Sequence, residues 1–198
     1  IKDMEFEYDG NPEFGQLMQE EIAKTGIRVQ AHNIKSLELE YGTLVPMRYM
    51  NQDRVFKVVS VSAFLTSHEL QDSRKFGEGL RAAIEKYDGT VAVFASGSLS
   101  HRFIWDREAT RGMDSYTREW DRQVDKHVVG MWERGEWAEF TKILPEYAEY
   151  CYGEGGMHDT AMLLGLLGWD QYDKAVEILT PVFPSSGTGQ INAVFPVE

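Results

Sequence analysis

The sequence predicts a single α/β domain with a largely parallel or mixed central sheet flanked by helices. Residues 56–64 and 90–94 are β-branched and aromatic runs typical of buried strands, and an apolar pattern of helical spacing lies between them. A strand, a helix and a second strand in this order form a βαβ unit, which favours parallel pairing. The 198 residues show no repeat and no linker, so one core is expected.

The first predicted helix begins beside Asn11. Asparagine is a favourable N-cap, and Pro12 fits the first helical turn. Apolar residues then recur at helical spacing until Gly26 provides a stop. Residues 27–30 are predicted to form a short strand, whereas residues 35–50 stay ambiguous because a glycine and a proline interrupt any regular pattern.

A capping box at residues 66–69 is expected to open the helix between the two strands. A more helical section follows the second strand. Three helices are expected there: one capped by Asp114 or Ser115, one over about residues 136–147 and one over about residues 157–167. The inward face of the first is predicted to carry Tyr116, Trp120, Val124, Val128 and Met131. Two apolar segments, residues 175–182 and 191–197, complete the chain.

The composition is that of an ordinary globular protein, with 42% hydrophobic residues and a net charge of −12. An acidic surface argues against nucleic acid and anionic membranes as partners. No apolar run is as long as a membrane span, and a cytoplasmic location is expected because one cysteine cannot form an intramolecular disulfide. That cysteine, Cys151, lies among apolar residues and is predicted to belong to the core.

The run from Val91 to His101 places a histidine just beyond a predicted strand and a turn of small residues. In open α/β sheets, ligands bind beyond the carboxyl ends of the strands. A histidine there can act as a general acid or base near neutral pH. A histidine that only hydrogen-bonds a loop fits the same pattern equally well.

A second cluster combines Glu154, His158 and Asp159 with several glycines at a helix start. Carboxylate and imidazole both suit iron or manganese, but acids are also favoured in the first turn of any helix. A centre of two histidines and one carboxylate needs further histidines. Among the others, His68 and His127 look structural or solvated, and His32, in a predicted loop, is kept as a possible active-site residue.

Several strings together resemble the class III extradiol ring-cleavage dioxygenases of the LigB superfamily. The string ASGSLSHR at residues 95–102 is similar to the catalytic-histidine motif of that family. The other matching strings are LEYGTLVPMRYM (39–50), YTRE (116–119), LPEYA (144–148), YCYGE (150–154) and SSGTGQ (185–190). Within the superfamily they are most similar to enzymes that open the ring of 3,4-dihydroxyphenylacetate.

The resemblance implies a homo-oligomeric non-haem Fe(II) enzyme, with Mn(II) as an occasional substitute, that takes a catechol and O2 as substrates. It implies that His101 is the base toward the catechol hydroxyl. The two metal-binding histidines of the family lie in an amino-terminal segment that precedes the matched strings. Residues 1–198 are therefore expected to be an incomplete catalytic domain that lacks amino-terminal strands and is inactive alone.

The resemblance also implies a second acid/base group, a metal carboxylate and a donor to the substrate carboxylate, and more than one residue fits each role. Many relatives carry Asp-His-Gly where this chain has Glu-Tyr-Gly, so Tyr41 or His32 would supply the second acid/base group, or neither does. Residue type favours Glu154 as the metal carboxylate, whereas the distance to the helix end favours Asp159. Arg48, Arg102 and the backbone around Ser186 are candidate donors to a substrate carboxylate, although each arginine could instead pair with a surface acid.

Two other functions fit the sequence. A non-catalytic subunit or pseudoenzyme of the same fold would also lack the two metal histidines. A metal-independent hydrolase or binding module would use His101 alone. An amino-terminal extension with two histidines at strand ends would distinguish the dioxygenase from both.

Overall fold

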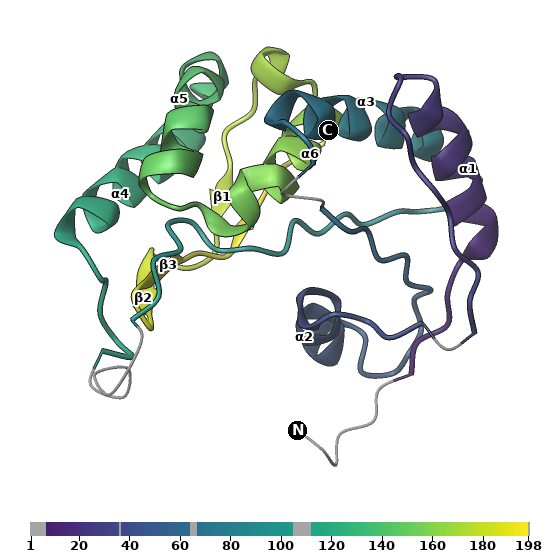
Figure 1. Cartoon of the computed structure of the whole chain (residues 1–198), viewed down its shortest axis with the longest axis horizontal. Helices are drawn as coiled ribbons and strands as arrows, with labels where there is room; N and C mark the ends of the chain where they lie inside the picture. The colour runs from purple at the N-terminus through teal and green to yellow at the C-terminus, as the bar shows by residue number, and fades with distance from the viewer. Residues whose placement is uncertain (1–6, 36, 64–66, 105–111, 198) are drawn as a thin grey trace.

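Helices dominate the computed structural model, which describes residues 7–35, 37–63, 67–104 and 112–197 (Figure 1). The α-helices are α1 (Pro12–Ala23), α2 (Tyr41–Met50), α3 (Leu70–Lys86), α4 (Glu119–Arg134), α5 (Trp137–Tyr150) and α6 (His158–Leu167). Two short 3-10 helices are η2 (Glu154–Met157) and η3 (Trp169–Gln171). None of the helices in the described ranges combines the length and the apolar character that crossing a membrane requires.

The predicted start of α1 is confirmed. The Asn11 side chain accepts a hydrogen bond of 3.1 Å from the Phe14 backbone N–H, and Pro12 occupies the first turn. At α3 the cap is one turn later than predicted. Glu69 is the N-cap, and its backbone N–H donates to the Asp72 carboxylate over 3.1 Å. Residue 66 of the predicted capping box lies outside the described residues.

Helices α3 and α6 cross in close backbone contact. A Cβ atom on Gly77 would lie 2.0 Å from the Met162 carbonyl oxygen, and one on Gly165 would lie 2.1 Å from the Arg74 carbonyl oxygen. Only glycine allows this approach at either position. Helix α1 packs on the same helix α3, and the cluster between them contains Phe14, Met18, Ile22, Leu80, Ala83 and Leu166.

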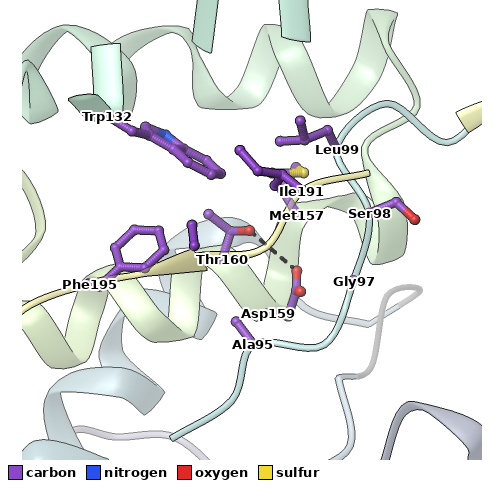
Figure 2. Close-up of a pocket in the computed structure, with 11 residues that line it drawn as sticks. Ala95, Gly97, Ser98, Leu99, Trp132, Met157, Asp159, Thr160, Ile191 and Phe195 are labelled. Atoms are coloured by element: carbon purple, nitrogen blue, oxygen red, sulfur yellow. Dashed lines mark hydrogen bonds between the residues drawn. The ribbon is translucent and has the colours of Figure 1, made fainter. Parts of the chain in front are cut away.

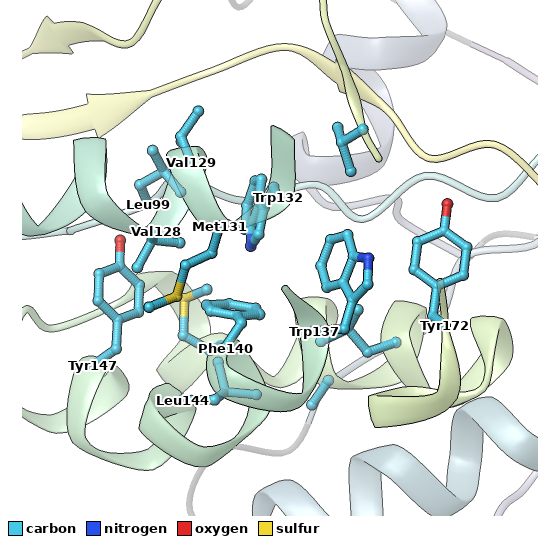
Figure 3. Close-up of a cluster of buried hydrophobic side chains, with 14 of the residues drawn as sticks. Leu99, Val128, Val129, Met131, Trp132, Trp137, Phe140, Leu144, Tyr147 and Tyr172 are labelled. Atoms are coloured by element: carbon cyan, nitrogen blue, oxygen red, sulfur yellow. The ribbon is translucent and has the colours of Figure 1, made fainter. Parts of the chain in front are cut away.

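A larger core lies between α4, α5 and α6 (Figure 3). The rings of Trp132 and Phe140 meet edge to face with centroids 5.5 Å apart, and Trp137 packs on both. The Trp137 indole N–H donates to the Lys174 carbonyl over 2.7 Å, so its one polar group is satisfied. Cys151 is buried in this core, as predicted, and burial raises the pKa of its thiol to about 12.

Two small antiparallel sheets lie in the carboxyl-terminal region. Strand β1 (Glu177–Ile178) pairs with β4 (Ala193–Val194). Strand β2 (Phe183–Ser185) pairs with β3 (Thr188–Gln190) in a hairpin, and the string SSGTGQ at residues 185–190 spans its turn and β3. The described part of the chain is thus a helix-rich α/β structure with small sheets.

The predicted strands at residues 27–30 and 90–94 do not form, and the described part of residues 56–64 contributes one isolated parallel bridge, between Gly10 and Val58. A central sheet is therefore not confirmed. A strand exists only where a neighbour accepts and donates its backbone hydrogen bonds. Residues 90–94 instead follow the irregular teal trace that crosses the molecule from α3 towards β3 (Figure 1). Phe94 there is 49% exposed, which a buried strand would not allow.

The inward face of α4 also differs from the prediction. Trp120 is 62% exposed, and two acids, Asp121 and Asp125, are fully buried. The helix begins at Glu119 rather than beside Ser115. Its buried residues include Asp121 and Asp125, which the prediction had not placed on the inward face.

Candidate active site

The turn that carries His101 is held by backbone hydrogen bonds on two sides. On one side the Leu99 N–H donates to the Gly189 carbonyl, and the Gly189 N–H donates to the Ser100 carbonyl, each over 2.9 Å. On the other side the His101 N–H donates to the Cys151 carbonyl, and the Glu154 N–H donates to the Leu99 carbonyl, each over 3.2 Å. These contacts fix the turn between β3 and the loop that precedes η2.

Three of the predicted site residues meet at one carboxylate. His101 Nδ1 lies 3.4 Å from Glu154 Oε2, and the Tyr41 hydroxyl donates to Glu154 Oε1 over 3.2 Å. The side chains of His101 and Glu154 are each about one fifth exposed, so both can reach a ligand. The Glu154 carboxylate raises the pKa of the Tyr41 hydroxyl, and partial burial adds to this effect.

The loop from Cys151 to α6 needs unusual backbone geometry to present Glu154. Gly155 and Gly156 have φ values of 58° and 60°, and Met157 has a φ of 62°. Glycine adopts this left-handed region without cost, whereas Met157 is strained there. A Cβ atom on Gly153 would lie 2.4 Å from the Met157 sulfur, so a side chain at 153 would force Met157 to move.

Asp159 lies beside a different space. It lines a small cavity of about 80 Å³, and the Thr160 hydroxyl donates a long hydrogen bond of 3.5 Å to it (Figure 2). A Cβ atom on Gly97 would lie 2.5 Å from Asp159 Oδ2, so the motif glycine allows the carboxyl group to sit there. Burial raises the pKa of the Asp159 carboxyl to about 6. The cavity wall also contains Ala95, Ser98, Leu99, Trp132, Met157, Ile191, Ala193 and Phe195.

The predicted cluster of Glu154, His158 and Asp159 does not converge. His158 is buried, and its Nδ1 atom lies 2.6 Å from the Ser73 hydroxyl of α3. Burial lowers the pKa of His158, and the nearby His68 lowers it further. Within the described ranges, His, Cys, Asp and Glu residues form no group of three or more that could hold a metal ion.

The arginine candidates differ in their surroundings. Arg102 lies over the Tyr152 ring, 3.9 Å from its centroid, and its Nε atom is 3.7 Å from the buried Asp121 carboxylate. These contacts fit the alternative in which Arg102 pairs with a protein acid. Arg48 lies in the last turn of α2 with an exposed side chain.

Ser186 and His32 lie in two irregular regions. Ser186 lies in the β2–β3 turn with a φ of 52°, and its carbonyl accepts from the Ile104 N–H over 2.9 Å. Its own N–H donates to the Met113 carbonyl over 2.8 Å, so this backbone is already used in loop packing. His32 is exposed before α2, and no hydrogen bond or ion pair among the described residues joins it to His101 or Glu154.

Sequence reasoning missed Asp125. Its Oδ1 atom accepts from the Ser100 N–H over 3.2 Å and from the Tyr147 hydroxyl over 2.7 Å, while Oδ2 accepts from the Ser100 hydroxyl over 2.7 Å. Burial raises the pKa of this carboxyl, although the hydrogen bonds oppose the shift. The available signal was two acids, Asp121 and Asp125, one helical turn apart and in line with Val128.

Comparisons with known proteins agree over most of the chain. The 3,4-dihydroxyphenylacetate 2,3-dioxygenase of Escherichia coli is 63% identical over 183 residues, which make up 92% of this chain and 66% of the relative. The chain thus spans slightly less than two thirds of that relative's length. Protein CA_C1420 of Clostridium acetobutylicum is 29% identical over 134 residues, 67% of this chain and 26% of that protein.

A weaker similarity, 27% identity over 93 residues, connects 46% of the chain with 12% of the chemotaxis protein CheA of Treponema pallidum. The family comparison covers far more of the sequence. Residues 1–196 match the family described as the catalytic LigB subunit of aromatic ring-opening dioxygenase. This match spans almost the whole chain, including His101, Glu154 and Tyr41. The chain therefore belongs to the LigB family.

Proposed function

We propose that this chain carries part of the active site of an extradiol dioxygenase that cleaves the ring of 3,4-dihydroxyphenylacetate with O2. The observation that carries the proposal is the meeting of His101 and Tyr41 at the Glu154 carboxylate. The similarity to the Escherichia coli dioxygenase supplies the substrate. No feature of the described residues favours the non-catalytic subunit or the hydrolase over this function.

His101 is the proposed base for the catechol hydroxyl. Its Nδ1 atom lies 3.4 Å from Glu154 Oε2, and this geometry supports Nε2 as the nitrogen that takes the proton. Phe103 packs edge to face on the imidazole with ring centroids 4.4 Å apart, which limits rotation of the ring. Tyr41 is the proposed second acid/base group, because its hydroxyl reaches the same carboxylate while His32 is not connected to it.

The metal of this enzyme is proposed to be non-haem Fe(II), with Mn(II) as a substitute. The described residues do not fit a complete centre of two histidines and one carboxylate, since they offer no group of three suitable ligands. Glu154 fits the carboxylate position best because its carboxylate lies 3.4 Å from His101 Nδ1, whereas Asp159 lines the small cavity. The remaining ligands would come from histidines outside the described residues.

The same reasoning extends to the fold. We propose that residues 1–198 belong to one catalytic domain whose central sheet is completed by further strands of a longer polypeptide. Exposed apolar side chains on the strand-like segments support this, since Phe56 and Phe94 are each about half exposed. Faster amide exchange of residues 90–94 in the 198-residue chain than in the complete polypeptide would support the proposal, and equal exchange would contradict it.

The remaining features are proposed from the family. The substrate carboxylate is expected to bind Arg48, Arg102 or the backbone near Ser186. The Arg102 guanidinium already contacts Tyr152 and Asp121, and the Ser186 N–H already donates to the Met113 carbonyl. The enzyme is expected to be a cytoplasmic homo-oligomer. No further partner beyond the catechol and O2 is needed for the reaction.

The test uses the complete polypeptide from the gene that encodes this chain, loaded with Fe(II) in air. Addition of 3,4-dihydroxyphenylacetate is expected to produce a yellow ring-opened product with uptake of one O2 per substrate. Absence of colour and of oxygen uptake with a fully iron-loaded protein would overturn the proposal. Colour with catechol alone but not with 3,4-dihydroxyphenylacetate would overturn only the choice of substrate.

A further inference from the structure

Two buried aspartates on α4 contact the two sequence neighbours of His101. Asp125 holds Ser100 through its backbone N–H and its hydroxyl. One turn earlier, Asp121 lies 3.7 Å from the Arg102 guanidinium and is also paired with Arg118. Both aspartates are 0% exposed. Helix α4 therefore holds the Ser100 backbone by a hydrogen bond and contacts the Arg102 side chain on the other side of His101.

The contact with Ser100 is the stronger of the two. Three hydrogen bonds reach Asp125 from buried donors, two on Ser100 and one on the Tyr147 hydroxyl. Tyr147 is itself buried on α5, so a second helix also holds the carboxylate. Strand β3 closes the site, because a Cβ atom on Gly189 would lie 1.8 Å from Asp125 Oδ2.

Core packing alone does not account for a carboxylate at this position. A buried carboxyl group is costly unless several donors satisfy it, and an apolar residue would fill the same space at lower cost. Apart from Asp121, the rest of the buried face of α4 is apolar around Val128 and Trp132. Both oxygens of Asp125 accept hydrogen bonds from Ser100, so the carboxylate holds the turn before His101 at two points.

We propose that Asp125 is a positioning residue for His101 that acts through Ser100, and that the Asp121–Arg102 contact supports it from the other side. This inference rests on the proposed function of His101 as the base. A shift of about 1 Å in a catalytic group can lower the rate on the order of a hundredfold. Loss of the hydrogen bonds that hold the turn should therefore lower kcat measurably.

The variants Asp125→Ala, Asp125→Asn and Val128→Ala in the complete iron-loaded polypeptide test the proposal. Asp125→Ala is expected to lower kcat about 30-fold or more while KM changes less than about threefold. Asp125→Asn is expected to restore kcat to within about fivefold of the wild type, because its carbonyl accepts from the Ser100 N–H and its amide can donate to the Ser100 hydroxyl. Val128→Ala, a buried apolar truncation one turn away, should lower Tm and leave kcat unchanged.

Equal loss of kcat in Val128→Ala and Asp125→Ala at matched loss of Tm would overturn the proposal, and so would an unchanged kcat in Asp125→Ala. Should Asp125→Ala fail to fold, Ser100→Ala removes one of the same hydrogen bonds and is expected to lower kcat with KM retained. An unchanged kcat in Ser100→Ala would then overturn the proposal.

Amide hydrogen exchange separates this inference from the proposed function. Exchange at the Ser100 and His101 amides is expected to be faster in Asp125→Asn than in the wild type, and faster again in Asp125→Ala. Exchange at the α5 amides is expected to stay at the wild-type level in both variants. This result would support positioning even if the wild type showed no ring cleavage, which would defeat only the proposed function. Unchanged exchange at both amides would overturn the positioning role.

Discussion

His101 and Glu154 lie 53 positions apart in the chain, and their side chains approach to 3.4 Å between Nδ1 and Oε2. The backbone on both sides of this pair is already joined by hydrogen bonds, so the approach follows from the fold rather than from side-chain flexibility alone. One carboxylate then serves an imidazole on one oxygen and a phenol on the other. This arrangement makes Glu154 the residue whose replacement should have the widest effect.

Replacement of each candidate metal carboxylate distinguishes them. In the complete polypeptide, Glu154→Gln is expected to lose most of its bound iron and its ring-cleavage activity. Asp159→Asn is expected to keep more than half of its iron, because Asp159 lies beside the small cavity rather than beside His101. Iron content by atomic absorption and turnover with 3,4-dihydroxyphenylacetate are the measurements. Full metal occupancy and turnover in Glu154→Gln would show that the assignment is wrong.

The acid/base partner is tested by Tyr41→Phe with His32→Asn as its matched control. Loss of the hydroxyl is expected to lower kcat about tenfold or more, since general acid–base groups contribute factors of this size or larger. Tyr41 is 68% exposed, so its replacement should change the free energy of unfolding by less than about 0.5 kcal/mol. His32→Asn should leave kcat unchanged. The reverse pattern would assign the role to His32.

The pKa of Asp159 predicts a pH-dependent stability. A carboxyl whose pKa rises to about 6 on folding holds its proton more tightly in the folded state. The contribution of Asp159 to the free energy of unfolding should therefore fall as pH rises from about 4 to about 6, by on the order of 2 kcal/mol, and stay level above that range. Asp159→Asn should remove this fall in urea unfolding at pH 4, 5 and 7. The control Asp170→Asn, at an exposed position, should retain the fall in the free energy of unfolding. A pH profile of Asp159→Asn that runs parallel to the wild-type profile would contradict the prediction.

The α3–α6 crossing predicts a large penalty for one added methyl group. Gly77→Ala should lower the free energy of unfolding by about 2 kcal/mol or more, because its Cβ would meet the Met162 carbonyl oxygen. Gly15→Ala in α1 is the control, since a Cβ there meets no atom within 4 Å. That variant should gain about 0.5 to 1 kcal/mol from helix propensity. Equal values for both variants in chemical unfolding would show that the crossing can relax.

Local signals in the sequence predicted the local structure. The cap at Asn11, the end of α6 at Leu167 before the left-handed Gly168 and the buried Cys151 all depend on residues within one or two turns. The strands failed because pairing depends on partners far away in the chain, and a β-branched run has the same composition whether or not a partner is present.

In the site, too, local features could be predicted from the sequence, whereas long-range contacts could not. The chemistry of His101 and Glu154 was visible in their residue types and in the family resemblance, but the contact between Tyr41 and Glu154 spans 113 positions and depends on how α2 packs. Asp125 was missed because a search for apolar stripes passes over an acid. Such a residue is recognised only when its three donors are known.

The paired backbone hydrogen bonds between the turn at residues 99–101 and the loop at residues 151–154 have one more consequence. The Glu154 N–H donates to the Leu99 carbonyl, and the His101 N–H donates to the Cys151 carbonyl, so two hydrogen bonds join the two segments. Thermal motion that opens or closes the surrounding irregular segments would carry the histidine and the carboxylate together. The spacing between the two side chains then stays constant while the segments around them move.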